Sequence, residues 1–235
     1  MTRVLFTLLF VFCIFIEPAA GELKWTTTDK HTTLVVLVLD RTGSMESSRD
    51  QVISGFNEYI EGLKNTEGAE FLFTLLLFDK YGDEHLAIDV PYKAAPLDDV
   101  KPLTRETYVP RGLTPLYDAI GHGMQVVEQG SGYDKVIFVI ITDGEENSSK
   151  EFSRDKIFKL IDEKKGLGNW TFAFLGADQD AYAASAAIGI SAGNTLSYDS
   201  ADTEATFGNL TEATSGAALS EKPASPNFFD VKKGD

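Results

Sequence analysis

Four long runs of apolar residues, each bounded by polar turns, dominate the chain from residue 34 onward. Because these runs do not alternate with polar residues, they are typical of strands that are buried on both faces. The runs are LVVLVL at 34–39, FLFTLLLF at 71–78, VIFVIIT at 136–142 and WTFAFLGA at 170–177. We therefore predict four central strands of a mainly parallel sheet.

Helical patterns lie between the runs, with apolar residues recurring on one face over 52–63 and over 116–127. Alternation of strands and helices predicts an α/β fold, Rossmann-like and doubly wound, with helices on both faces of a mostly parallel sheet. Residues 86–90 differ, because apolar and other residues alternate there after the turn residues KYGDE. This pattern predicts a half-exposed edge strand, antiparallel to the run before it.

The remaining segments have weaker patterns. Residues 91–111 contain four prolines and no clear period, which predicts an ordered loop. We expect a helix near 181–187, a short strand near 194–198 and a last helix at about 202–217. The sequence thus predicts one domain over 32–217, followed by a loose C-terminal tail at 218–235.

The first 21 residues have the layout of a secretory signal peptide. Arg3 precedes an apolar run of 13 residues, and the small residues of EPAAG follow it. This run is shorter than the roughly 20 residues that a membrane-spanning helix needs. We therefore expect cleavage near Ala20 or Gly21, a mature chain without a membrane span, and a secreted or periplasmic protein.

Composition narrows the possible functions. The chain has 235 residues, 43% of them hydrophobic, and a formal net charge of −15. Such an acidic protein is a poor partner for nucleic-acid phosphates. Its single cysteine, Cys13, excludes an internal disulfide and a cysteine-rich zinc site. Any metal would have to be bound by oxygen or histidine ligands.

Oxygen-bearing side chains follow two of the predicted strands. The sequence DRTGSM places Asp40, Thr42 and Ser44 at alternating positions after the first strand, and Asp143 follows the run at 136–142. If these two strands are neighbours, both acids lie in one crevice at their carboxyl ends, and Thr114 can reach it from the loop before the second helix. Two carboxylates and three hydroxyls are hard ligands, which favours Mg²⁺ or Mn²⁺ over zinc or copper.

DRTGSM, LTPLYDAI and ITDGEEN together resemble the motifs of a von Willebrand factor A (vWA) domain, and compact stand-alone bacterial members in particular. The resemblance implies six strands in the order 3-2-1-4-5-6, with strand 3 antiparallel. It also implies a metal-ion-dependent adhesion site (MIDAS), where Mg²⁺ accepts a Glu or Asp carboxylate from a protein partner. The metal ligands would be Asp40, Thr42, Ser44, Thr114 and Asp143, although Thr42 stands where the family usually has serine.

Two other functions remain open at this point. DRTGS also resembles the phosphorylation loop of haloacid-dehalogenase-like phosphotransfer enzymes, in which Asp40 would be the nucleophile. That interpretation leaves the Thr114 segment unexplained, and the chain has no obvious cap domain, so we expect a protein that is not an enzyme. Alternatively, the domain is a structural scaffold that binds no metal, for which Thr42 is the one indication.

Several other polar residues are given a simpler interpretation. We interpret Glu145 and Glu146 as a solvated acidic turn, Asp118 as the start of a polar helix face, and Asp79 as a strand end away from the crevice. The triplets at Asn147, Asn169 and Asn209 are possible glycosylation sites, if the host glycosylates secreted chains.

Overall fold

Six strands form a single sheet in the order β3-β2-β1-β4-β5-β6. The computed structural model describes residues 31–82, 85–177, 181–198, 203–222 and 224–229. All neighbouring strands pair in parallel except β2 and β3, which are antiparallel. The strands are β1 Thr32–Asp40, β2 Glu70–Tyr81, β3 His85–Pro96, β4 Lys135–Thr142, β5 Trp170–Ala177 and β6 Thr195–Tyr198. The predicted fold class and strand order are confirmed.

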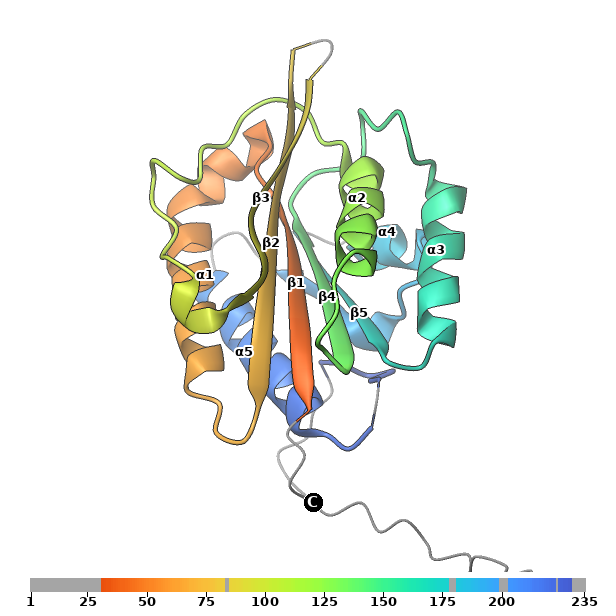
Figure 1. Ribbon diagram of the computed structural model, residues 1–235. Helices are drawn as coiled ribbons and strands as arrows, with labels where there is room; N and C mark the ends of the chain where they lie inside the picture. Colours follow the sequence, from red (N-terminus) through yellow and green to blue (C-terminus); the bar gives the residue numbers. More distant parts are fainter. Residues whose placement is uncertain (1–30, 83–84, 178–180, 199–202, 223, 230–235) are drawn as a thin grey trace, which may run out of the picture.

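Helices cover both faces of the sheet (Figure 1). One face carries α1 and α5, and the other carries α2, α3 and α4. The α-helices are α1 Arg49–Lys64, α2 Leu116–Glu128, α3 Arg154–Gly166, α4 Ala181–Ala187 and α5 Thr203–Leu219. Short 3-10 helices occur at η1 Gly43–Ser48, η2 Leu97–Asp99 and η3 Ala192–Asn194. Among the described residues, none of these helices is sufficiently long and apolar to traverse a bilayer.

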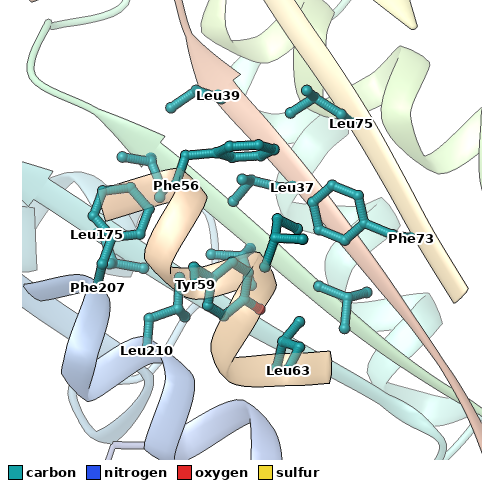
Figure 2. Close-up of a cluster of buried hydrophobic side chains, with 14 of the residues drawn as sticks. Leu37, Leu39, Phe56, Tyr59, Leu63, Phe73, Leu75, Leu175, Phe207 and Leu210 are labelled. Atoms are coloured by element: carbon teal, nitrogen blue, oxygen red, sulfur yellow. The ribbon is translucent and has the colours of Figure 1, made fainter. Parts of the chain in front are cut away.

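The position of β1 inside the sheet explains why apolar and polar residues do not alternate in its sequence. Leu37 and Leu39 pack with α1 and α5 (Figure 2), whereas Val36 and Val38 pack with α2 on the other face. Successive side chains of a strand point to opposite faces, so both sets must be apolar when both faces are covered. The same alternation carries Asp40 to the face that α2 covers, at the carboxyl end of the sheet.

Two elements differ from the sequence prediction. The edge strand β3 is antiparallel as expected, but it continues to Pro96, so residues 91–96 of the predicted loop are strand. The pairing of β3 with β2 contains two register shifts, and β3 also contains Pro91. Both features obscure the alternation on which the prediction relied. Helix α3 was not predicted, because only Ile157 and Ile161 of its residues are buried.

The C-terminal tail at 218–235 was expected to be loose, and its described part differs from that prediction. Residues 224–229, here called the C-terminal segment, pack on the domain, and the Phe228 side chain is fully buried in the core on the α1 and α5 face. Asn194 fixes this segment, since its amide donates to the Ser225 carbonyl and its oxygen accepts from the Phe228 N–H. The predicted signal peptide at 1–21 lies outside the described residues.

Candidate metal centre

The two predicted acids lie at the carboxyl ends of neighbouring strands. Asp40 is the last residue of β1, and Asp143 directly follows β4. β1 and β4 are paired in parallel up to Leu39 and Ile141. The condition on which the predicted crevice depended, that these two strands are neighbours, is therefore met.

Hydroxyl groups connect the three loops at this edge of the sheet. Ser44 Oγ donates to Asp143 Oδ1 at 2.6 Å, and Thr42 Oγ1 lies 3.2 Å from Ser44 Oγ. Thr114 Oγ1 donates to Thr42 Oγ1 at 3.3 Å. The structure thus brings together all five predicted side chains, which we call the oxygen cluster: Asp40, Thr42, Ser44, Thr114 and Asp143.

Asp40 is the most enclosed member of the cluster, with 0% of its surface exposed. Its Oδ1 accepts the Thr42 N–H at 2.7 Å, and its Oδ2 accepts the Thr142 hydroxyl at 2.6 Å. Burial raises the pKa of Asp40 to about 7 despite these bonds, and the nearby charge of Asp143 acts in the same direction. The charged carboxylate is therefore unfavourable here unless a cation accompanies it.

Arg41, the positively charged residue next to Asp40 in the sequence, does not pair with the Asp40 carboxylate. The Arg41 guanidinium instead pairs with buried Asp79, with Nε at 2.7 Å from Oδ2, and with Asp89 at 2.8 Å. Arg111 Nε reaches the same Asp79 oxygen at 3.3 Å. The Asp79 carboxylate therefore holds two arginines of the surrounding loops.

The loop that carries Thr114 is fixed to the end of β2. Lys80 and Leu113 exchange two backbone hydrogen bonds, of 3.1 and 2.9 Å. Gly112, directly before Leu113, has a φ of +72°, and a Cβ there would lie 2.1 Å from the Lys80 carbonyl oxygen. Only glycine fits this position without strain or clash.

Close approach also requires glycine next to Asp143. A Cβ on Gly144 would lie 3.0 Å from Thr114 Oγ1 and 3.3 Å from Ser44 Oγ. The absence of a side chain lets the loop after β4 close against the hydroxyls of the other two loops.

Three residues that organise the loop between β4 and α3 were not foreseen from the sequence. Asn147 Oδ1 accepts the Thr114 N–H at 2.9 Å, and its own N–H donates to the Thr114 carbonyl. Asp118 is buried and accepts three backbone N–H groups, those of residues 150, 151 and 152. The interpretation of Asp118 as part of a polar helix face is therefore wrong.

Glu146 requires a similar correction. Its carboxylate accepts the N–H groups of Ser148, Ser149 and Tyr117, and the Ser149 hydroxyl. It stabilises the loop rather than forming a solvated turn, whereas Glu145 is exposed, as expected. The spacing of residues in the sequence does not predict that Asp118 and Glu146 bind backbone N–H groups, because those groups belong to loops without periodicity.

A groove runs beside the oxygen cluster, between α2 and α4. It has a volume of about 580 Å³ and is bordered by Asp143, Gly144 and Glu145 at the cluster. Its other walls are mainly apolar, from Leu116, Phe174, Ala181 and Ile188. The site therefore has an open side next to Asp143.

The donor set fits a hard divalent cation. All five side chains offer oxygen, and two are carboxylates, which is the ligand type of Mg²⁺ and Mn²⁺. Within the described part of the chain, no three His, Cys, Asp or Glu side chains come together as a metal cluster, so hydroxyls would have to complete the ligand set. A cation here would compensate the buried charge of Asp40 and the like charge of Asp143.

Several solved structures of other proteins are similar to this fold. The vWF domain of the type V pili tip protein Mfa5 from Porphyromonas gingivalis aligns with a TM-score of 0.59, at 10% identity, over 83% of this chain and 98% of that one. The chain has a vWA-like fold. Proximal thread matrix protein 1 from the mussel byssus aligns with a TM-score of 0.58, at 12% identity, over 79% of this chain and 47% of that one.

A further structure of the mussel protein, described as having a zinc-occupied MIDAS motif, aligns with a TM-score of 0.56 at 12% identity, over 79% of this chain and 46% of that one. The vWA-like chain thus spans about half the length of the mussel protein. No protein-family model and no curated protein matches its sequence.

The three glycosylation triplets lie in different environments. Asn209 is exposed on α5, and Asn147 is exposed in the loop beside Thr114. Asn169 donates its side-chain amide to the Asp134 carbonyl, and Thr171 of its triplet is buried in β5. Of the three asparagines, Asn209 is the one at which a glycan would disturb the fold least.

Proposed function

We propose that this protein is a divalent-cation-dependent binding module, in which Mg²⁺ is held by Asp40, Thr42, Ser44, Thr114 and Asp143. A bound Mg²⁺ would supply a positive charge and an open coordination position. The partner is a protein that contributes a Glu or Asp carboxylate to the metal.

One observation carries the proposal: five oxygen-bearing side chains from three segments of the chain meet, and one of them is the fully buried Asp40, whose neighbouring charge, that of Asp143, is negative. Proteins seldom bury a carboxylate without a compensating charge. A hard cation provides that charge, and the hydroxyls complete its shell.

Because the protein is itself acidic, an acidic ligand would be attracted to it only by the charge of the bound metal. At a net charge of −15 the protein repels acidic groups in general. A carboxylate would be attracted only where the metal charge dominates locally, which makes binding dependent on the cation. Nucleic acid is not a partner under this proposal.

The phosphotransfer alternative is less well supported. It uses Asp40 as a nucleophile, yet both carboxylate oxygens of Asp40 accept hydrogen bonds and the residue is fully buried. It also gives no role to Thr114, which contacts Thr42 in the cluster. We therefore propose a protein that is not an enzyme.

Thermal melting in Mg²⁺ and in EDTA tests the metal site. A ligand at 100 times its dissociation constant adds about 2.7 kcal/mol of stability, or roughly 5 to 11 °C for a domain of this size. Asp40→Asn and Asp143→Asn should abolish this increase. The control Asp98→Asn removes an exposed charge near the Pro96 end of β3, opposite the cluster, and should keep the increase.

The alternatives predict other results. A metal-free scaffold would melt at the same temperature in Mg²⁺ and EDTA, and this result would refute the proposal. A phosphotransfer enzyme would hydrolyse a chromogenic phosphate ester in Mg²⁺, with the activity lost in Asp40→Asn.

We further propose that the protein is secreted or periplasmic, after cleavage of the leader near Ala20 or Gly21. The support is the layout of its first 21 residues. Mass spectrometry of the protein from its native source would give the mature N-terminus, and an intact Met1 would contradict the proposal.

A further inference from the structure

Large apolar side chains are exposed next to the oxygen cluster. Tyr81 is 67% exposed and Leu113 is 51% exposed, and we call these two residues the ridge. They are two of the seven large hydrophobic side chains that are exposed in the described part of the chain. An apolar group of this kind beside a binding site is typical of an interaction surface.

The ridge adjoins the cluster through the chain itself. Leu113 precedes Thr114 directly, and consecutive Cα atoms are about 3.8 Å apart. Tyr81 follows Lys80, which pairs with Leu113 across an antiparallel bridge. Figure 1 shows the β2–β3 hairpin rising past the ends of the other strands at this edge of the sheet. A molecule bound at the cluster therefore passes beside the ridge.

The ridge is held in place before any partner binds. The Arg111 guanidinium lies 6.0 Å from the centre of the Tyr81 ring and also pairs with buried Asp79. The Arg111 N–H donates to the Arg41 carbonyl at 2.9 Å, which ties the ridge to the loop of Asp40. A preorganised surface loses little entropy on binding, so its apolar area contributes to affinity.

Charge indicates the class of partner. The proposed metal supplies the positive charge of the site, since the half-exposed Arg111 at the ridge already pairs with Asp79. On the other side of the cluster, the exposed Glu145 borders the groove. The net charge of −15 disfavours an anionic membrane as the occupant. An acidic protein segment with a large apolar residue matches both the charge and the exposed surface.

We infer that the ridge receives a large apolar or aromatic side chain of the protein partner, within a few residues of the acid that reaches the metal. This inference rests on the proposed function, because the metal anchors the acid. It adds a second determinant of the partner: an acidic residue alone is a weak ligand.

Selection from a displayed library of short peptides tests the inference. Each peptide carries one fixed Asp or Glu among random residues, and clones bound to the Mg²⁺-loaded protein are eluted with EDTA. We expect the eluted clones to be enriched in Phe, Tyr, Trp, Leu or Ile near the fixed acid. Tyr81→Ser with Leu113→Ser should weaken them about tenfold, the effect of losing one buried apolar contact.

The variant Leu167→Ser is the matched control, since Leu167 is also exposed but lies just after α3, far from the cluster in the fold. It should leave peptide affinity unchanged. Stabilisation by Mg²⁺ should persist in the Tyr81 and Leu113 double variant, because neither side chain is a proposed ligand.

Three outcomes would overturn the inference. Eluted clones without an apolar preference would do so, as would affinities that the double variant leaves unchanged, or an absence of clones released by EDTA. A dimer that forms in Mg²⁺ and is lost in the double variant would instead assign the ridge to a second copy of this chain. In each case, a melting temperature that is still higher in Mg²⁺ than in EDTA would support the proposed metal site independently of the ridge.

Discussion

Replacing Gly112 by alanine should disrupt the loop that presents Thr114. The backbone φ of +72° is a left-handed conformation, which costs a non-glycine residue roughly 1–2 kcal/mol. In addition, the new Cβ would lie 2.1 Å from the Lys80 carbonyl oxygen, too close for any real contact. The loop must move, and the two backbone bonds between Lys80 and Leu113 are then lost.

The magnitude follows from these two contributions. Two hydrogen bonds at about 1 kcal/mol each add about 2 kcal/mol to the conformational strain. Gly132→Ala is the matched control, because Gly132 has a φ of +91° and a Cβ there would meet nothing within 4 Å, so that it reports the strain alone. The Gly112→Ala protein should therefore melt roughly 4–8 °C below Gly132→Ala, at 2–4 °C per kcal/mol.

Calorimetry of both variants in EDTA measures this difference, and a repeat in Mg²⁺ measures the effect on the site. Displacement of Thr114 should reduce the Mg²⁺ stabilisation in Gly112→Ala, whereas Gly132→Ala should keep all of it. Equal melting temperatures, or an equal Mg²⁺ response, would refute the link between the Gly112 turn and the oxygen cluster.

Three further predictions concern the core, a loop and pH. Phe228→Ala should cost about 3–5 kcal/mol in denaturant unfolding, as for other buried phenylalanines; a loss below about 1 kcal/mol would contradict the docking of 224–229. Asp118→Ala leaves three backbone N–H groups without their acceptor and should cost about 3 kcal/mol or more, with less loss for Asp118→Asn. Burial raises the pKa of Asp40 to about 7 from 3.8. The contribution of Asp40 to the free energy of unfolding, measured in EDTA, should therefore decrease as the pH rises from about 4 through 7. Since Mg²⁺ must displace that proton, its stabilising effect should be larger at about pH 8 than at about pH 5.5 in melting experiments, and the opposite trend would contradict this linkage.

The sequence predicted the elements whose signal is local. Each of the four apolar runs is a strand, because burial on both faces leaves no polar positions to mask the pattern. The five members of the oxygen cluster could be foreseen for a related reason. They lie immediately after buried strands or before a helix, where parallel topology brings distant residues to one edge.

Features that depend on tertiary partners could not be predicted. Helix α3 buries only Ile157 and Ile161, so its charged sequence resembles a solvated segment. Asp118 and Glu146 act on backbone N–H groups of a loop, which leave no trace in side-chain periodicity. Phe228 follows two prolines and a lysine in a stretch typical of loose tails, and it is buried because Asn194 holds the backbone of its segment.

The docked segment at 224–229 also fixes how the molecule can be tethered. Residues 224–227 lie beside Lys135, where β4 begins, and the oxygen cluster lies where β1 and β4 end. The eight residues of β4 separate these two places by about 23 Å at the usual strand rise. A sensor chip, bead or fluorescent label coupled beyond Phe229 would thus leave the opposite pole of the molecule facing the solution.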